Sequence, residues 1–262
     1  MRLATFLPPS GGDAPLAGEV SGDEVVAFAA GETVLARLAS GDRTPARGEA
    51  FPLADVTLLA PVPRPRAIFG IGLNYAAHAS EGGRDAPEAP LVFMKPPGSA
   101  APPNAPVRCP AVVRRLDYEG ELAVVMGAGG QVAGYAVADD VSARDLQKRE
   151  PQWTRAKGAD GFCPYGPWIT TADEVENPED LRLQTWVNGE LRQDARTSDF
   201  IFGIEWLIAF LSETCTLEPG DLILTGTPAG VGAFSDPPAF LGSGDVVRIE
   251  IEGLGAIEHA IA

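Results

Sequence analysis

Two glutamates separated by a single glycine are the first residues of this sequence that could do chemistry. Glu119 and Glu121 flank Gly120, and the segment continues into the apolar residues 122–126. Side chains two residues apart point to the same face of a β-strand, so the two carboxylates would lie together. Carboxylates that close repel each other and raise one pKa unless a cation relieves them. The spacing fits a buried metal site and equally a solvent-facing strand edge, where such pairs are common.

A third carboxylate can reach this pair through a predicted hairpin. Asp140 follows the apolar run 132–138, and the glycine-rich residues 127–130 separate that run from the first one. A turn at these glycines would place Asp140 beside Glu119 and Glu121. Three carboxylate oxygens on a rigid sheet suit Mg²⁺ or Mn²⁺, with water or substrate completing an octahedron.

A histidine and a glutamate at helical spacing offer a general base. His78 and Glu81 are three residues apart, which makes them neighbours if this stretch forms a helical turn. A carboxylate beside an imidazole orients the ring and raises its basicity, as the activation of water requires. A surface ion pair has the same spacing and is the more frequent case. Gly82, Gly83 and Pro87 follow, so this segment is also predicted to form a mobile lid.

Further stretches contain groups that can bind a carboxylate. Arginine supplies 17 of the 20 cationic side chains, and two of the three lysines, Lys95 and Lys157, lie in such stretches. A lysine provides a compact ammonium with a tunable pKa. The glycine-rich residues 224–232 can turn backbone N–H groups toward an anion. They lack the Gly-Lys-Ser/Thr of a nucleotide-binding loop, and an ordinary turn has the same composition.

The N-terminal part of the chain is predicted to be a separate β-rich unit. Residues 1–60 contain strand-like runs at 25–30 and 33–38, divided by turn residues. The proline-rich residues 61–66 favour an extended connector, which places a domain boundary there.

Residues 67–262 are predicted to form the catalytic domain, and short strands dominate it. The strand-like runs are 67–69, 91–94, 121–126, 132–138, 181–187, 222–224 and 246–251. Helical periodicity is clear only at 142–150 and 200–214. Many strands of uneven length with few helices favour a mixed, β-rich fold over a doubly wound sheet.

The composition is that of an acidic globular protein. A net charge of −16 argues against nucleic acid as a partner, because a phosphate backbone needs a basic surface. No apolar stretch reaches the ~18 to 20 residues of a membrane span, and the N-terminal residues lack the apolar core of a signal peptide. Three cysteines without metal-type spacing indicate reduced thiols. We therefore expect a cytoplasmic protein with no membrane partner, which needs local cations if it binds an anion.

Taken together, these stretches resemble the fumarylacetoacetate hydrolase superfamily from about residue 67 to residue 257. Each motif alone is unspecific, but all of them in this order are highly specific. The matching stretches are 72–75 with His78 and Glu81, 93–96, 117–121, 134–135, 140–147, 157–158 with 162–164, 187–190 and 225–232. The chain departs from the commoner family pattern at Asp139, where asparagine is frequent.

The resemblance implies a fold and a metal centre. The fold would be a fumarylacetoacetate hydrolase-like β-sandwich or roll with few helices, usually assembled as a homodimer. Glu119, Glu121 and Asp140 would bind Mg²⁺ or Mn²⁺.

The resemblance also implies catalytic and binding roles. His78 and Glu81 would form a dyad on a lid that closes over the substrate, and Lys157 would stabilise developing negative charge. The pocket would be lined by Tyr75, Lys95, Arg144, Gln147 and Thr227.

The implied substrate is a small keto or enol carboxylic acid, and three reactions fit the same residues. We expect hydrolysis of a C–C bond in an acylpyruvate-type 2,4-dioxo acid, with His78 taking a proton from water and the metal acting as a Lewis acid. An isomerase or tautomerase of 2-hydroxymuconate-like diacids would use His78 to move a proton without attack by water. An oxaloacetate decarboxylase would need no base. A non-enzymatic metal-binding structural protein is the remote alternative.

Overall fold

The computed structural model describes residues 1–9 and 14–262, which form a β-rich molecule with few helices. The strands are β1 Arg2–Leu7, β2 Leu16–Ser21, β3 Glu24–Ala27, β4 Ala50–Pro52, β5 Thr57–Leu59, β6 Ile68–Gly72, β7 Leu91–Lys95, β8 Ala100–Ala101, β9 Leu116–Asp117, β10 Gly120–Met126, β11 Val132–Asp139, β12 Ser142–Ala143, β13 Cys163–Thr171, β14 Arg182–Val187, β15 Glu190–Arg196, β16 Leu222–Leu224, β17 Val246–Ile251 and β18 Gly255–Ala260. The helices are α1 Val34–Ser40, α2 Ala76–Glu81, α3 Arg144–Arg149, α4 Thr154–Lys157 and α5 Ile204–Ser212. The predicted mixed, β-rich fold is confirmed.

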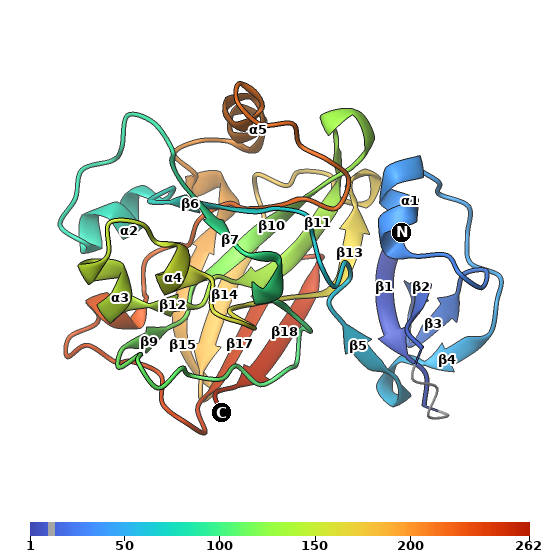
Figure 1. Cartoon of the computed structure of the whole chain (residues 1–262), viewed down its shortest axis with the longest axis horizontal. Coiled ribbons are helices and arrows are strands. Elements are labelled where there is room, and N and C mark those ends of the chain that lie inside the picture. Colours follow the sequence, from blue (N-terminus) through green and yellow to red (C-terminus); the bar gives the residue numbers. More distant parts are fainter. Residues whose placement is uncertain (10–13) are drawn as a thin grey trace.

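Two packed sheets form the body of the molecule (Figure 1). The larger sheet has the order β4-β3-β2-β1-β13-β11-β10-β16-β6-β7, with β5 beside β1 and β8 beside β13. The smaller sheet has the order β15-β14-β17-β18 and packs with β14, β17 and β18 against β10, β11 and β13. Pairing is antiparallel except between β16 and β6 and between β13 and β8.

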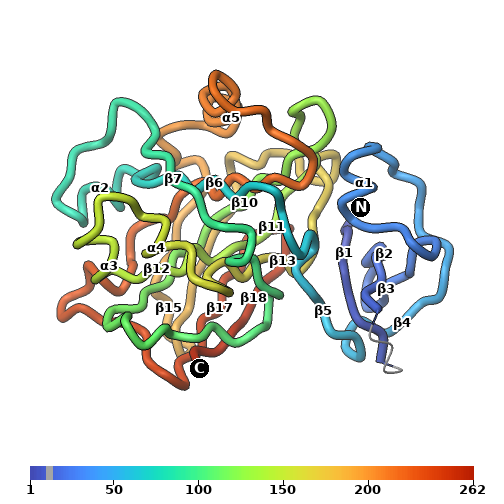
Figure 2. The backbone as a smooth tube through the Cα atoms, viewed as in Figure 1, coloured from blue at the N-terminus to red at the C-terminus, as the bar shows by residue number. Residues whose placement is uncertain are grey.

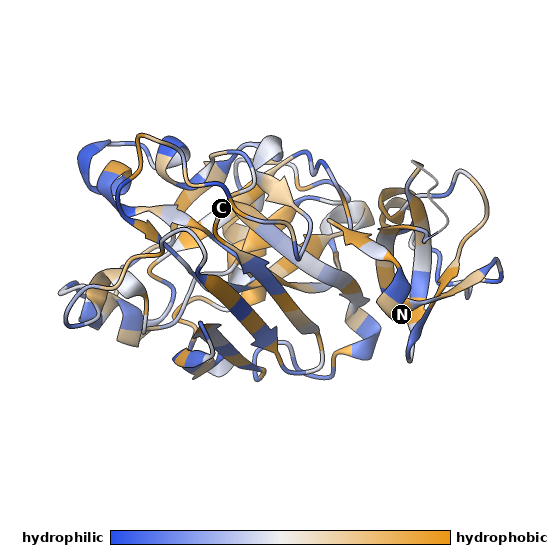
Figure 3. Cartoon of the chain, turned by 90° about the horizontal axis from the view of Figure 1, so that it is seen from below, coloured by the Kyte–Doolittle hydropathy of each residue, from blue (hydrophilic) through white to orange (hydrophobic). Residues whose placement is uncertain are grey.

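Strand β10 is buried on both faces. Leu122 and Val124 belong to the core shared with the smaller sheet, whereas Ala123 and Val125 belong to a second core on the opposite face. This is why its sequence is a continuous apolar run rather than an alternating one. The strands of the smaller sheet bury only alternate residues, and hydrophilic and hydrophobic positions alternate along strands in Figure 3.

The N-terminal strands extend the larger sheet instead of standing apart from it. Strand β1 pairs with β13, with Leu3 opposite Ile169. Figure 2 traces the chain from β5 through residues 61–66 to β6, which lies near the other end of the same sheet. Residues 61–66 contain no strand or helix, as the prolines predict. The division into two domains stays a prediction.

The strand predicted at 33–38 is wrong, because this stretch forms helix α1. The hydroxyl of Thr33 accepts the backbone N–H of Ala36 at 3.0 Å and caps the first turn. Gly41 ends the helix in the left-handed conformation that glycine favours. The apolar residues Val34 and Leu38 are four apart and bury one helix face, a spacing that fits a helix better than a strand.

Three short helices gather at the end of the larger sheet that carries β6 and β7. Helices α2, α3 and α4 lie together on the left of Figure 1, and α4 contacts both α3 and β7. The predicted helices at 142–150 and 200–214 correspond to α3 and α5. None of the helices in the described residues is long and apolar enough to span a bilayer.

Candidate active site

The three carboxylates expected to bind a metal lie together. Glu119, Glu121 and Asp140 each offer an oxygen atom, and these atoms lie within 4.8 Å of one another. The hairpin of β10 and β11 brings them together, because it pairs Gly120 with Asp139. The backbone N–H of Asp140 also donates to the carbonyl oxygen of Glu119 at 2.9 Å. We call these three residues the floor; all are buried, so the solvent-facing alternative does not hold.

Two buried lysines neutralise part of the floor. Lys157 Nζ contacts Glu119 and lies 2.7 Å from Asp140 Oδ2, and Lys95 Nζ contacts the other Asp140 oxygen. Burial disfavours the charged ammonium, but the two carboxylates outweigh it and raise the pKa of Lys157. Lys157 is therefore held as a cation beside the acidic floor.

The two glutamates have opposite electrostatic environments. Burial opposes ionisation of Glu119, but Arg144 and Lys157 outweigh it and hold the pKa of this carboxyl well below its usual range. Burial and the neighbouring Asp140 and Glu119 charges raise the pKa of Glu121 well above its usual range. Among the described residues, no cationic side chain forms an ion pair with Glu121, which accepts the backbone N–H of Gly226 at 2.7 Å.

This imbalance fits a bound divalent cation. A buried carboxylate without a cationic partner is costly, and a divalent ion next to Glu121 would remove that cost. Three buried carboxylate oxygens also form the hard donor set that Mg²⁺ and Mn²⁺ prefer. The backbone contact to Glu121 depends on glycine, because Gly226 has φ +98° and a Cβ there would lie 2.7 Å from Cβ of Asn74.

Arg144 links the floor to the loop at 230–233. Its Nε donates to Asp117 at 2.8 Å, and its Nη1 lies 2.6 Å from Glu119 Oε1. The Asp117 carboxylate also accepts the backbone N–H groups of Gly232 and Ala233. Burial raises the pKa of Asp117 against the opposing effect of Arg144. Nη2 of Arg144 is buried without a hydrogen-bond partner in the described residues.

The histidine–glutamate pair lies beside the floor, and His78 is not at the surface. His78 Nδ1 lies 2.7 Å from Glu81 Oε1 on helix α2, and His78 is buried. A carboxylate only accepts hydrogen bonds, so Nδ1 is the donor in this contact and Nε2 is the ring nitrogen available for other contacts. Glu81 Oε2 accepts the backbone N–H of Gly230 at 3.0 Å. We call residues 76–89 the lid; this contact docks it onto the glycine-rich loop.

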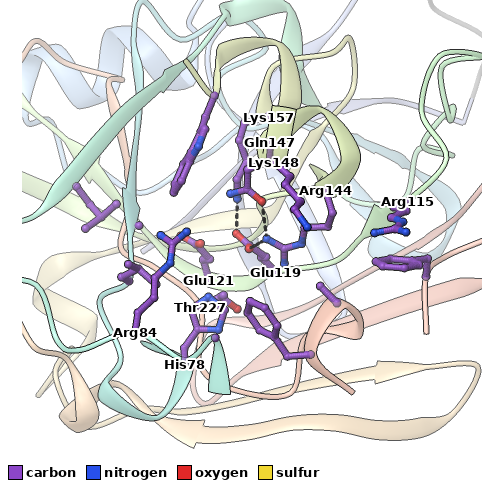
Figure 4. A pocket seen from close by; sticks show the side chains of 18 residues that line it. His78, Arg84, Arg115, Glu119, Glu121, Arg144, Gln147, Lys148, Lys157 and Thr227 are labelled. Carbon is purple, nitrogen blue, oxygen red and sulfur yellow. Dashed lines mark hydrogen bonds and ion pairs between the residues drawn. The ribbon is translucent and has the colours of Figure 1, made fainter. Parts of the chain in front are cut away.

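A cavity of about 460 Å³ joins these groups. His78, Glu119, Glu121, Arg144 and Lys157 converge on it in Figure 4. Of the residues expected to line the pocket, Arg144, Gln147 and Thr227 do so.

Tyr75 and Lys95 are not among the residues that line the cavity. Lys95 lies behind the floor, where it contacts Asp140, and Tyr75 is buried against Phe200. The Tyr75 hydroxyl has no hydrogen-bond partner within the described residues, and burial raises its pKa. Contact of either side chain with substrate stays a prediction.

The sequence interpretation missed a buried acid–histidine pair that supports the floor. His259 Nε2 lies 2.9 Å from Asp139 Oδ2, and Asp139 Oδ1 accepts the backbone N–H of Glu119 at 2.8 Å. The pair connects β18 of the smaller sheet to β11 of the larger one. Alternation in the sequence could have shown that His259 is buried. It lies between Ile257 and Ile261 at a spacing of two, and all three side chains are buried.

Gln193 is a second residue that sequence reasoning did not single out. Its Oε1 accepts the backbone N–H of Gly120 at 3.1 Å, and its Nε2 donates to Thr227 Oγ1 at 2.8 Å. This amide fixes Thr227 beside the floor. No local pattern marks it, because its neighbours in β15 are polar and mostly solvent-accessible.

Comparison with known proteins gives one family. The family model described as "Fumarylacetoacetate (FAA) hydrolase C-terminal" matches residues 67–262. An oxaloacetate tautomerase of Bacillus subtilis is 44% identical over 225 residues, which are 80% of this chain and 75% of that protein.

Two solved structures that each cover 100% of this chain show the range of activities among similar proteins. A 2-hydroxyhepta-2,4-diene-1,7-dioate isomerase from Mycobacterium marinum is 38% identical with a TM-score of 0.83 and 98% coverage. A maleylpyruvate hydrolase from Sphingobium, solved with manganese(II) and pyruvate, is 31% identical with a TM-score of 0.79 and 99% coverage. Relatives with this fold therefore include tautomerases, isomerases and hydrolases.

Proposed function

This chain belongs to the fumarylacetoacetate hydrolase family, and we propose that it is a metal-dependent tautomerase that interconverts the keto and enol forms of a small oxo acid such as oxaloacetate. The observation that carries this proposal is the placement of one base, His78, beside a buried carboxylate floor in a single cavity. Tautomerisation needs one proton to move and no second reactant. The similarity to an oxaloacetate tautomerase supports this reaction over the hydrolysis expected from the sequence.

The residues of this chain would divide the proton transfer between them. Glu119, Glu121 and Asp140 would hold Mg²⁺ or Mn²⁺, which supplies a Lewis acid for the oxo and carboxylate oxygens. His78 Nε2 removes the proton from the carbon beside the carbonyl, and the electron pair left on that carbon forms the enol double bond. Glu81 holds the imidazole in the correct tautomer.

Lys157 would stabilise the negative charge that develops during the reaction. When the carbon loses its proton, negative charge moves to the carbonyl oxygen. A buried ammonium at the floor stabilises this charge without reorganising. The enolate oxygen then takes a proton from the protonated imidazole or from water, which completes the enol and leaves His78 neutral again. In the reverse direction the enol oxygen loses its proton and protonated His78 delivers one to carbon, so one base serves both directions.

The direct test is to follow enolic oxaloacetate by its ultraviolet absorbance in the presence of purified protein and Mg²⁺ or Mn²⁺. We expect ketonisation faster than in buffer, with oxaloacetate conserved by NMR. Rapid formation of pyruvate from oxaloacetate would instead identify a decarboxylase. No acceleration of ketonisation at any metal concentration would refute the proposal.

Hydrolysis of an acylpyruvate is the second candidate. It is supported by the similarity to a maleylpyruvate hydrolase whose structure contains manganese and pyruvate. The same His78 would then remove a proton from water instead of carbon. Incubation with acylpyruvates separates the two functions, because only the hydrolase releases pyruvate and a carboxylic acid from them.

A further inference from the structure

The rim of the cavity carries three cations that the mechanism above does not use. Arg84, Arg115 and Lys148 line it, and all three are solvent-exposed. None of them forms an ion pair within the part of the chain that the structure describes, in a protein of net charge −16. Unpaired cations at a pocket concentrate anions locally even where the surface as a whole repels them.

Arg84 differs from the other two because its backbone is fixed to the helix of the catalytic dyad. Helix α2 ends in a Schellman motif: the N–H of Gly83 donates to Ser80 O at 3.0 Å, and the N–H of Arg84 donates to Ala79 O at 2.9 Å. Gly83 has φ +66°, which glycine adopts without strain. The chain therefore reverses directly after the helix, and Arg84 turns back toward the pocket.

This geometry makes Arg84 and His78 parts of one unit. Figure 4 shows Arg84 and His78 on the same side of the pocket, whereas Arg115 lies on the far side. Arg115 is also partly engaged, because its guanidinium lies 5.6 Å from the centre of the Phe240 ring. The contact of Glu81 with Gly230 docks the whole unit onto the glycine-rich loop.

We propose that Arg84 binds a second carboxylate of the substrate, at the end remote from the floor, so that the pocket selects oxo diacids over oxo monoacids. This inference rests on the proposed function for the placement of the first carboxylate at the floor. A guanidinium suits this role because its planar N–H groups match the two oxygens of a carboxylate. A diacid then contacts the floor at one end and the lid at the other, and its binding holds His78 in place over the reacting carbon.

The test measures the effect of Arg84→Gln on two substrates, one with and one without the distal charge. Oxaloacetate and its 4-methyl ester have the same oxo acid group, but the ester is neutral at the remote end. We expect Arg84→Gln to lower kcat/KM for oxaloacetate tautomerisation by about 10- to 100-fold, the effect of losing a hydrogen bond to a charged group, and to change that of the ester by less than about threefold. Arg84→Lys should recover part of the loss.

Two control variants make the result specific. Arg115→Gln removes the same charge from the same cavity, and Arg64→Gln removes one from an exposed position outside the lining. Neither should change the preference for the diacid. An equal loss on both substrates for Arg84→Gln, or the same selective loss for Arg115→Gln, would overturn the assignment of Arg84.

A binding experiment separates this inference from the proposed function. Malate and 2-hydroxybutanoate share a 2-hydroxy acid group, and only malate has a distal carboxylate. Calorimetry on the Mn²⁺-loaded protein should show tighter binding of malate to the wild type and no such preference in Arg84→Gln. If the wild type tautomerises nothing but shows this preference, the function fails and the carboxylate site stands. If the wild type binds both acids equally, the site is wrong whatever the activity.

Discussion

The floor and the lid of this pocket are built in opposite ways. The floor lies at the paired ends of β10 and β11 in the middle of the larger sheet, with Glu121 in β10, Glu119 directly before β10 and Asp140 directly after β11. All three side chains are buried and held by hydrogen bonds and ion pairs. The lid is one short helix and an exposed segment, docked through Glu81 and carrying Arg84 at its rim. Under the proposed function, the groups that must bear charge without reorganising lie in the floor, and the groups that would meet the substrate as it enters lie in the lid.

The strongest test of this comparison is to remove the floor carboxylate that has no cationic partner. Glu121→Gln should abolish activity and weaken Mn²⁺ binding by more than the ~10- to 100-fold typical of losing a partner that merely orients a ligand. The metal-free fold should not lose stability, because the repulsion on Glu121 is relieved. Titration calorimetry and thermal unfolding measure both effects; unchanged Mn²⁺ affinity would exclude Glu121 as a ligand.

Removing the base from the lid should leave the floor intact. His78→Ala should slow tautomerisation by ~10² to 10⁴, the usual contribution of a general base. Mn²⁺ affinity should stay at the wild-type value, because His78 is not a predicted ligand. Any decarboxylation of oxaloacetate should change only a few-fold, since loss of CO₂ requires no base. Full tautomerase activity in this variant would show that the dyad is only an ion pair.

The residue that orients the base should have a smaller effect. Glu81→Gln removes a charged partner of His78, worth ~1.5–3 kcal/mol or about 10- to 100-fold in rate. The amide oxygen can still accept the N–H of Gly230, so the lid should dock. Steady-state kinetics of both variants, measured under the same conditions, check that Glu81→Gln loses less activity than His78→Ala. A larger loss for Glu81→Gln would contradict this order.

The floor also predicts a pH dependence of metal binding. The pKa of Glu121 is raised in the metal-free fold. Its carboxyl therefore keeps a proton at pH values at which the unfolded chain, with the ordinary pKa of 4.5, has released it. This group therefore destabilises the metal-free protein increasingly as pH rises from 4.5 toward the folded pKa. A metal ion displaces the same proton, so Mn²⁺ affinity should rise with pH in that window by up to about tenfold per pH unit. Calorimetry in buffers of different ionisation enthalpy counts the released proton, and an affinity independent of pH would refute this.

The smallest effect on metal binding is expected from breaking the pair of His259 and Asp139, which supports the floor. His259→Leu leaves the buried Asp139 Oδ2 without its donor, which should lower the free energy of unfolding by ~1–3 kcal/mol. Because Asp139 also holds the backbone of Glu119, Mn²⁺ affinity should fall by about tenfold. Urea unfolding and calorimetry measure the two quantities. Glu258→Gln, an exposed neighbour on β18, is the control and should change neither.

The sequence predicted the parts of the site that lie close together along the chain. Alternation placed Glu119 and Glu121 on one face, the glycines at 127–130 predicted the hairpin to Asp140, and helical spacing paired His78 with Glu81. These contacts are local or depend on a single turn, so residue spacing is enough to predict them. The same periodicities predicted the many strands of residues 67–262. The strand prediction at 33–38 was wrong because the helix cap at Thr33 was overlooked.

Only the tertiary structure decided how these groups are charged and supported. Glu121 receives its hydrogen bond from Gly226, 105 residues away, and His259 reaches Asp139 across 120 residues. Which glutamate gains cationic partners depends on where Lys157 and Arg144 come to lie after the sheets have packed. Local spacing cannot predict such contacts, because the order of strands in a sheet is set by the burial of the whole chain. The sequence therefore determined the chemical groups, and the packing of the two sheets determined which carboxylate needs a cation.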